Sequence, residues 1–136
     1  MGGEAQQRTG GAAPSFDAQF APHNRDVFRE AASRELAAGA DALERARDYA
    51  ARGKPEFVLA YLLAASAPDA TKRALYADTF DARAVRTEQR AGELDRRFHR
   101  PFPLLRLDAA KDRATAARIR SGGSLRPGLG RPLPTL

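Results

Sequence analysis

The chain of 136 residues contains no cysteine and no tryptophan, and its only β-branched aliphatic residues are Val27, Val58, Val85 and Ile119. Without cysteine it can form neither a disulfide framework nor a thiolate metal site nor a redox pair. The scarcity of β-branched residues disfavours strands, whereas 29 alanines favour helices. The composition therefore predicts an all-α fold in one domain.

Residues that could carry catalysis are also few. The chain has two histidines, His23 and His99, and no serine stands in the glycine-flanked pattern of a nucleophile elbow. Asp95 and His99 are four residues apart on one predicted helix, but a metal centre in a helical bundle needs ligands from several helices. A histidine that interacts with the negative end of the helix dipole is the preferred interpretation. We expect a noncatalytic protein with no cofactor and no metal.

The longest apolar run extends from Glu56 to Ala65 and holds nine apolar residues among ten. It has no polar face, which is typical of a helix that is covered on all sides. Its length is about half of the ~20 residues that a membrane span requires, and Pro55 and Pro68 flank it. The sequence therefore predicts a short apolar central helix that ends near Ser66, and no transmembrane segment.

Amphipathic helices are predicted on either side of this run. With Asn24 as N-cap, apolar residues of the segment 24–52 step by three and four, and Gly39 lies in their stripe. That glycine marks either a close approach of another backbone or a break between two helices. A second stripe covers residues 76–98. We expect a small three- to four-helix antiparallel bundle.

The pattern is weaker outside these stripes. Residues 16–22 are expected to form an irregular lead-in that packs on the bundle. Prolines follow residue 98, so residues 102–107 are predicted to be extended. Asp108 is predicted to cap an Ala-rich helix that ends at Arg120, and Ile119 is its only sizeable apolar residue, so it is expected to bury little.

Both ends of the chain are rich in glycine and lack apolar periodicity, which predicts disorder. The expected organisation is a disordered N-terminal segment at 1–16, a helical bundle at 17–107, a basic Ala-rich helix at 108–120 and a flexible Gly/Pro-rich tail at 121–136.

Positive charge is concentrated in the last third. Residues 1–94 hold 13 basic and 14 acidic side chains, whereas residues 95–136 hold 10 and 3. Clustered cations with interleaved aromatic residues are typical of phosphate-backbone binding with base stacking. The same aromatic residues also fit the core stripe, and three aspartates dilute the cluster. The candidate basic binding arm consists of Arg96, Arg97, Arg100, Arg106, Lys111, Arg113, Arg118 and Arg120.

A groove between the long helices is the other candidate site. Its predicted walls are Tyr49, Tyr61, Tyr76 and Phe80, although each of these rings also fits a core position. We expect an adaptor or complex subunit that offers this groove to a partner helix. The alternative is a nucleic-acid-associated protein that binds RNA or DNA through residues 96–131. A third hypothesis is a homodimer that completes a larger bundle.

The first residues lack the apolar core of a signal peptide and include Glu4, an acid of the kind that transit peptides avoid. We therefore expect an intracellular protein, cytoplasmic or nuclear. Protein is the expected partner.

Overall fold

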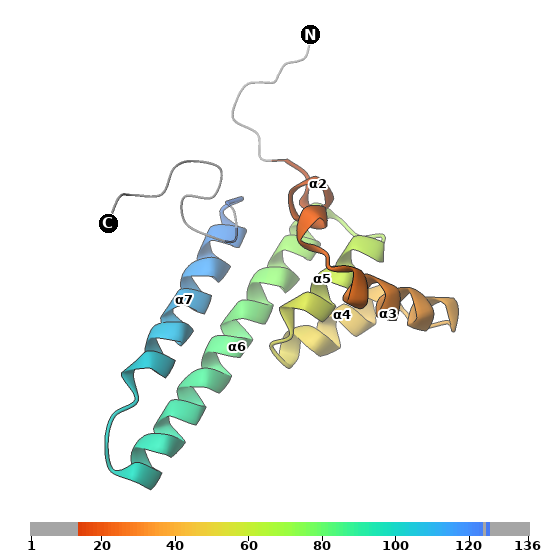
Figure 1. Cartoon of the computed structure of the whole chain (residues 1–136). Coiled ribbons are helices and arrows are strands. Elements are labelled where there is room, and N and C mark those ends of the chain that lie inside the picture. Colours follow the sequence, from red (N-terminus) through yellow and green to blue (C-terminus); the bar gives the residue numbers. More distant parts are fainter. Residues whose placement is uncertain (1–13, 124, 126–136) are drawn as a thin grey trace.

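The computed structural model describes residues 14–123 and 125, and within them the chain consists of helices joined by turns (Figure 1). The elements are α2 (Phe16–Phe20), the 3-10 helix η1 (Ala21–His23), α3 (Asp26–Ala37), α4 (Ala42–Ala51), α5 (Pro55–Ala64), α6 (Asp69–Phe98) and α7 (Pro103–Arg120). These residues contain no strand, which confirms the all-α class. Most residues of the expected disordered ends lie outside the described part of the chain.

The predicted central helix is α5, and it supplies much of the core. Its buried residues are Pro55, Val58, Leu59, Ala60, Tyr61 and Leu62. Helices α3, α4 and α6 pack against it, so the apolar run is covered from several sides as its composition requires. Pro55 occupies the first helical position, where its missing N–H leaves no hydrogen bond unmade.

Residues 24–52 form two helices, so Gly39 marks a break. Its φ is +103°, a conformation that favours glycine. A Cβ placed there would meet nothing within 4 Å, which leaves the turn and not a close approach as the reason for glycine. The first helix begins at Asp26, so the prediction of Asn24 as its N-cap is wrong. The Asp41 carboxylate caps the second helix.

The lead-in of residues 16–22 is helical where the sequence suggests an irregular segment. The Ser15 hydroxyl caps α2 by accepting the backbone N–H of Ala18. Phe16 and Phe20 are buried, and their ring centroids lie 5.7 and 5.1 Å from that of Tyr76 on α6. The folded part of the chain therefore begins before residue 17, the expected boundary.

Helix α7 begins at Pro103, so the predictions of an extended segment up to residue 107 and of Asp108 as a helix cap are wrong. A proline fits the first helical position because its φ is already helical and the donor it lacks would have no partner there. Ile119, near the other end of α7, is fully buried. The helix therefore contributes more to the core than its alanine-rich sequence suggests.

Helices α6 and α7 are joined along a seam of alanines. Every member of the seam is fully buried: Ala77, Ala84 and Ala91 on α6, and Ala109 and Ala116 on α7. The alanines of each helix are seven residues apart, and a repeat of seven keeps one stripe of each helix facing the other. Because the distance between two helix axes depends on the side chains at their contact, an alanine seam brings the two backbones close together.

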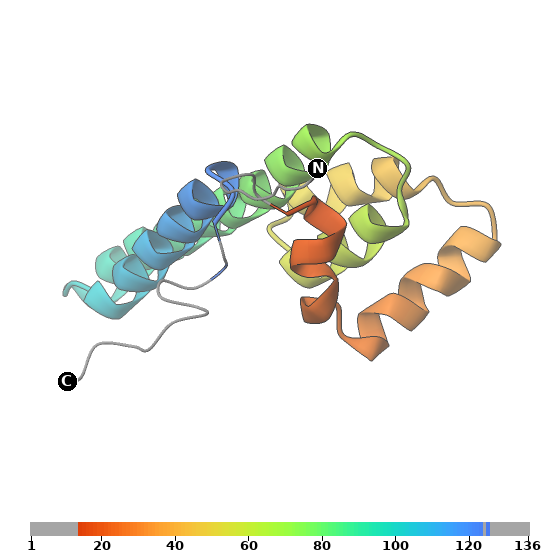
Figure 2. The same ribbon diagram turned by 90° about the horizontal axis from the view of Figure 1, so that it is seen from above.

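The α6–α7 pair is a long antiparallel hairpin that projects beyond the other helices (Figures 1 and 2). Helices α2 to α5 lie beside the N-terminal half of α6, and we call this assembly the body. The C-terminal half of α6 and the facing half of α7 extend away from it. In the part of the chain that the structure describes, no helix has the length and apolar character needed to cross a lipid bilayer.

Candidate functional site

Three arginines of the basic arm, spaced by seven residues along α7, pair with acidic side chains of α6. From the free end of the hairpin toward the body, the pairs are Arg106 with Asp95, Arg113 with Glu88, and Arg120 with Asp78 and Asp81. The repeat of seven that sets the alanine seam also keeps these flanking positions in register. We call the set the ion-pair ladder.

The ladder shifts the pKa values of Asp95, Glu88 and the two arginines that pair with them toward the charged forms. The hydrogen bond from Arg106 lowers the pKa of Asp95, and that from Arg113 lowers the pKa of Glu88. The same bonds raise the pKa of each arginine. Because these pairs are at the surface, salt screens them. Much of the charge asymmetry along the chain is thus an internal match between two helices.

The remaining cations of the arm are divided between two places: Arg96, Arg97 and Arg100 near the turn of the hairpin, and Lys111 and Arg118 along α7. Arg97 lies over the ring of Phe98 at 5.6 Å, and Arg100 lies over that of Phe102 at 5.0 Å. The expected arm is therefore divided among the ladder, the turn and single positions on α7.

Asp95 and His99 complete the end of α6. Asp95 accepts the backbone N–H of Phe102 at 3.0 Å and pairs with Arg106, so its carboxylate is engaged within the hairpin. His99 follows the last residue of α6 with a left-handed φ of 56°. Within residues 14–123 and 125, no group of three or more side chains is placed to hold a metal ion.

The four rings of the candidate groove lie in two clusters. Tyr49 stacks on Tyr61 with centroids 5.8 Å apart, and Tyr76 contacts Phe80 at 5.3 Å. All but Tyr49 are buried. Burial, together with a hydrogen bond to Glu35, raises the pKa of Tyr61 to about 12. Three of the four rings are therefore core side chains, and the two on α6 also border a cleft.

That cleft lies where the hairpin meets the body and has a volume of about 460 Å³. We call it the junction cleft. Its apolar wall comprises Pro55 and Leu59 of α5 and Tyr76 and Phe80 of α6. Polar groups from η1, α6 and α7 border the same space. The cleft thus combines an apolar wall with a polar rim, as small binding sites commonly do.

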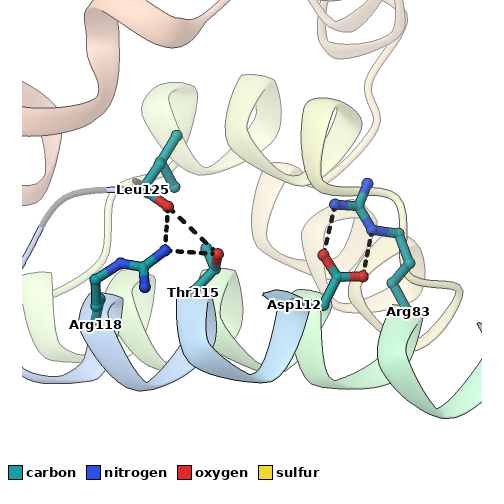
Figure 3. Close-up of polar contacts among 5 residues, drawn as sticks. All are labelled: Arg83, Asp112, Thr115, Arg118 and Leu125. Carbon is teal, nitrogen blue, oxygen red and sulfur yellow. Dashed lines mark hydrogen bonds and ion pairs between the residues drawn. The ribbon is translucent and has the colours of Figure 1, made fainter. Parts of the chain in front are cut away.

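Arg83 and Asp112 form a two-point ion pair at the rim of the junction cleft (Figure 3). The Nε and Nη2 groups of Arg83 each donate to one carboxylate oxygen of Asp112 at 2.9 Å. This bond raises the pKa of Arg83 against the opposing effect of burial. Because a two-point pair has a defined geometry, it fixes α7 against α6 at the cleft.

Leu125 also lines the junction cleft, and its backbone oxygen faces α7 (Figure 3). That oxygen accepts hydrogen bonds from Arg118 Nη2 at 2.7 Å and from Thr115 Oγ1 at 3.3 Å. Arg118 Nη2 also donates to Thr115 Oγ1 at 3.0 Å. The Leu125 side chain packs against the hydrophobic core. A residue of the segment that follows α7 therefore forms part of the cleft wall.

Glycines after α7 direct the chain toward this cleft. Gly122 has a φ of +89°, and Gly123 donates its N–H to the backbone oxygen of Arg118 at 2.6 Å. Gln19 of α2 donates to the backbone oxygens of both glycines, at 3.3 and 2.7 Å. The start of the expected flexible tail is thus held against the body. The sequence signal for this contact is a glycine just past a helix end, which often reverses the chain.

No protein-family model matches this chain, and no curated protein or solved structure does so either. Function is therefore inferred from the junction cleft, the ion-pair ladder and the turn of the hairpin.

Proposed function

We propose that the protein is a noncatalytic helical interaction module, an adaptor or complex subunit, whose junction cleft binds a short leucine-containing segment of a partner protein. The observation that carries the proposal is Leu125, a wall residue of the cleft. Its backbone oxygen accepts hydrogen bonds from Thr115 and Arg118, and its side chain packs against the core. A site that binds a leucine of its own chain in this way is suited to an equivalent residue of another chain.

Two kinds of contact would act on the bound segment. Arg118 and Thr115 donate to a backbone oxygen, which every residue carries, so these bonds provide affinity without selecting a side chain. The apolar wall then favours a residue with a compact apolar side chain. Together the contacts would select a leucine or a residue of similar shape.

The size of the cleft favours a short segment over a whole helix. A helix with its side chains is about 10–12 Å across, whereas the cleft encloses about 460 Å³. That volume accommodates a few side chains. We therefore propose a short segment in place of the partner helix that the sequence suggests.

Nucleic-acid binding through residues 96–131 is the alternative, and the ladder weighs against it. Affinity for a phosphate backbone comes from cations that neutralise phosphates. Arg106, Arg113 and Arg120 neutralise acids of α6 instead. Binding of a phosphate backbone would have to compete with these pairs. A homodimer stays a separate prediction, which light scattering at two concentrations tests.

A labelled synthetic peptide of residues 121–130 tests the cleft without knowledge of the partner. The acceptor is the full-length Leu125→Ala variant, in which the side chain at position 125 no longer competes for the apolar contacts. We expect fluorescence anisotropy to detect binding, and wild-type chain to bind roughly tenfold more weakly because a tethered segment competes at a high effective concentration.

Two matched changes establish whether the cleft is the binding site. In the Leu125→Ala background, Thr115→Val keeps the side-chain volume but removes the hydroxyl donor, and should weaken peptide binding. Arg47→Gln alters an exposed cation of α4 and should leave it unchanged. The proposal would be refuted if a peptide with alanine in place of the leucine bound as tightly as the unmodified peptide. It would also be refuted if wild-type chain bound the peptide as tightly as the Leu125→Ala chain.

A further inference from the structure

The turn that joins α6 and α7 is the free end of the projecting hairpin (Figures 1 and 2). We define the hairpin tip as residues 96–107. The tip contains four arginines and neither aspartate nor glutamate. The preceding Asp95 is already bonded to Arg106 and to the backbone of Phe102. The tip therefore presents positive charge at the point farthest from the body.

Large apolar side chains are exposed at the same end. Leu104 is 74% exposed, Phe98 is 53% exposed and Leu107 is 51% exposed. Among the described residues, the other exposed large apolar side chains are Val27 on α3 and Val85 on α6. A concentration of exposed apolar surface in one short segment is typical of an interaction site.

Two arginines lie next to this apolar surface. Arg97 and Arg100 rest over the rings of Phe98 and Phe102. Among residues 14–123 and 125, neither arginine has a carboxylate within ion-pair distance. Their charges are therefore available to an external anion while their stems lie along apolar side chains.

The shape of the tip is determined by contacts within the hairpin. The ring centroids of Phe98 and Phe102 lie 5.9 Å apart across the turn. Asp95 joins the end of α6 to the start of α7 through Phe102 and Arg106. Pro103 restricts the backbone at the first position of α7. Binding at the tip would therefore require little ordering of the backbone.

We propose that the hairpin tip binds the surface of an anionic lipid bilayer. Phe98, Leu104 and Leu107 enter the boundary between headgroups and acyl chains, and Arg97 and Arg100 meet lipid phosphates. This inference goes beyond the proposed function, because it concerns a surface other than the junction cleft.

Charge complementarity and the exposed apolar groups of the tip favour an anionic bilayer as its binding partner. An anionic bilayer offers negative charge and an apolar interior at one surface. A nucleic acid offers phosphates, but its backbone gives no apolar environment to two exposed leucines. A protein partner would need a cavity that fits a projecting end, whereas a bilayer deforms around it.

Vesicle flotation with the full-length chain tests the inference. The probes are vesicles of pure phosphatidylcholine and vesicles in which phosphatidylserine replaces roughly a third of it. We expect flotation with the anionic vesicles only. Leu104→Ser should reduce the apparent affinity by about tenfold because the serine side chain loses the apolar contact. Replacement of both Arg97 and Arg100 by glutamine should also reduce it, and added salt should weaken the wild-type interaction.

Matched variants on the body provide the controls. Val27→Ser removes a side chain that is 60% exposed on α3, and Arg47→Gln removes an exposed cation on α4. Both should float as wild-type chain does. Failure of the wild-type chain to float, or equal losses in the body variants, would overturn the inference. So would RNA binding that depends on Arg97 and Arg100 and is unaffected by Leu104→Ser.

Discussion

Replacement of Ala109 by leucine should destabilise the hairpin. Ala109 is fully buried in the alanine seam, where it faces α6. A leucine side chain at this position needs space that the facing backbone occupies. The two helices must therefore separate or the leucine must adopt a strained rotamer, and in either case the seam loses close packing.

The expected magnitude follows from the burial. Overpacking of a close-packed core typically costs about 1–3 kcal/mol, and we take about 2 kcal/mol for this position because a helix in a two-helix hairpin can shift partway. For a domain of this size, such a loss lowers Tm by roughly 10 °C. Thermal unfolding followed by far-ultraviolet circular dichroism measures it.

The neighbouring Ala110 provides the matched control because it is exposed on the same helix. Leucine and alanine have similar helix propensities, so Ala110→Leu should change Tm by little. Equal effects of the two substitutions, or a stabilising effect of Ala109→Leu, would refute the close-packed seam.

Three further predictions address the ladder, a tight turn and a buried phenol. Glu88→Arg or Arg113→Glu alone should lower Tm, and the two changes together should restore it. High salt should reduce both the losses and the recovery. Gly53→Ala should destabilise more than Gly39→Ala in chemical denaturation, since both glycines have positive φ but a Cβ at Gly53 would lie 2.9 Å from backbone of the facing helix. Tyr61 has its pKa raised from 10.0 to about 12, so the stability it contributes is fully present below pH 10 and is lost as pH rises toward 12. Circular dichroism against pH should show that loss in wild-type chain, and a Tyr61→Phe variant with the same alkaline transition would contradict the assignment.

The sequence was sufficient where a pattern was local and strong. The unbroken apolar run of residues 57–65 is typical of a covered helix, and the structure places five of its members in the core. The stripe of residues 76–98 likewise predicted the long helix α6, although the sequence suggests an end near Arg100 and the helix ends at Phe98. In both cases the side chains of one segment are enough to predict the helix.

Other features depended on a second segment. Asp108 resembled a helix cap, but the helix starts earlier, at Pro103, and its first turns are joined to the end of α6 by the pair of Arg106 with Asp95. The cluster of arginines resembled a binding arm because the acids that pair with it lie on another helix, although both sets repeat every seven residues. A comparison of their spacing would have predicted the ladder.

The junction cleft could not be predicted from one element. Its apolar wall comes from α5 and α6, and the donors beside it come from α7. A further wall residue, Leu125, lies beyond a Gly-Gly pair that resembles a linker. Rings that the sequence assigned to a groove are mostly core, because neighbouring helices cover them.

Affinity capture from a native lysate, with and without nuclease, tests most directly the claim that this protein binds another protein through the junction cleft. Truncation before α7 is unsuitable because it would remove the buried Ile119. The comparison therefore uses the Leu125→Ala chain by itself, the same chain with Thr115→Val, and the same chain with Arg97→Gln and Arg100→Gln. We expect to capture proteins that are retained after nuclease treatment and by the variant with both arginine changes, and that are lost with Thr115→Val. If the captured molecules are lost after nuclease treatment and with both arginine changes, but are retained by Thr115→Val, the claim of protein binding through the junction cleft is contradicted.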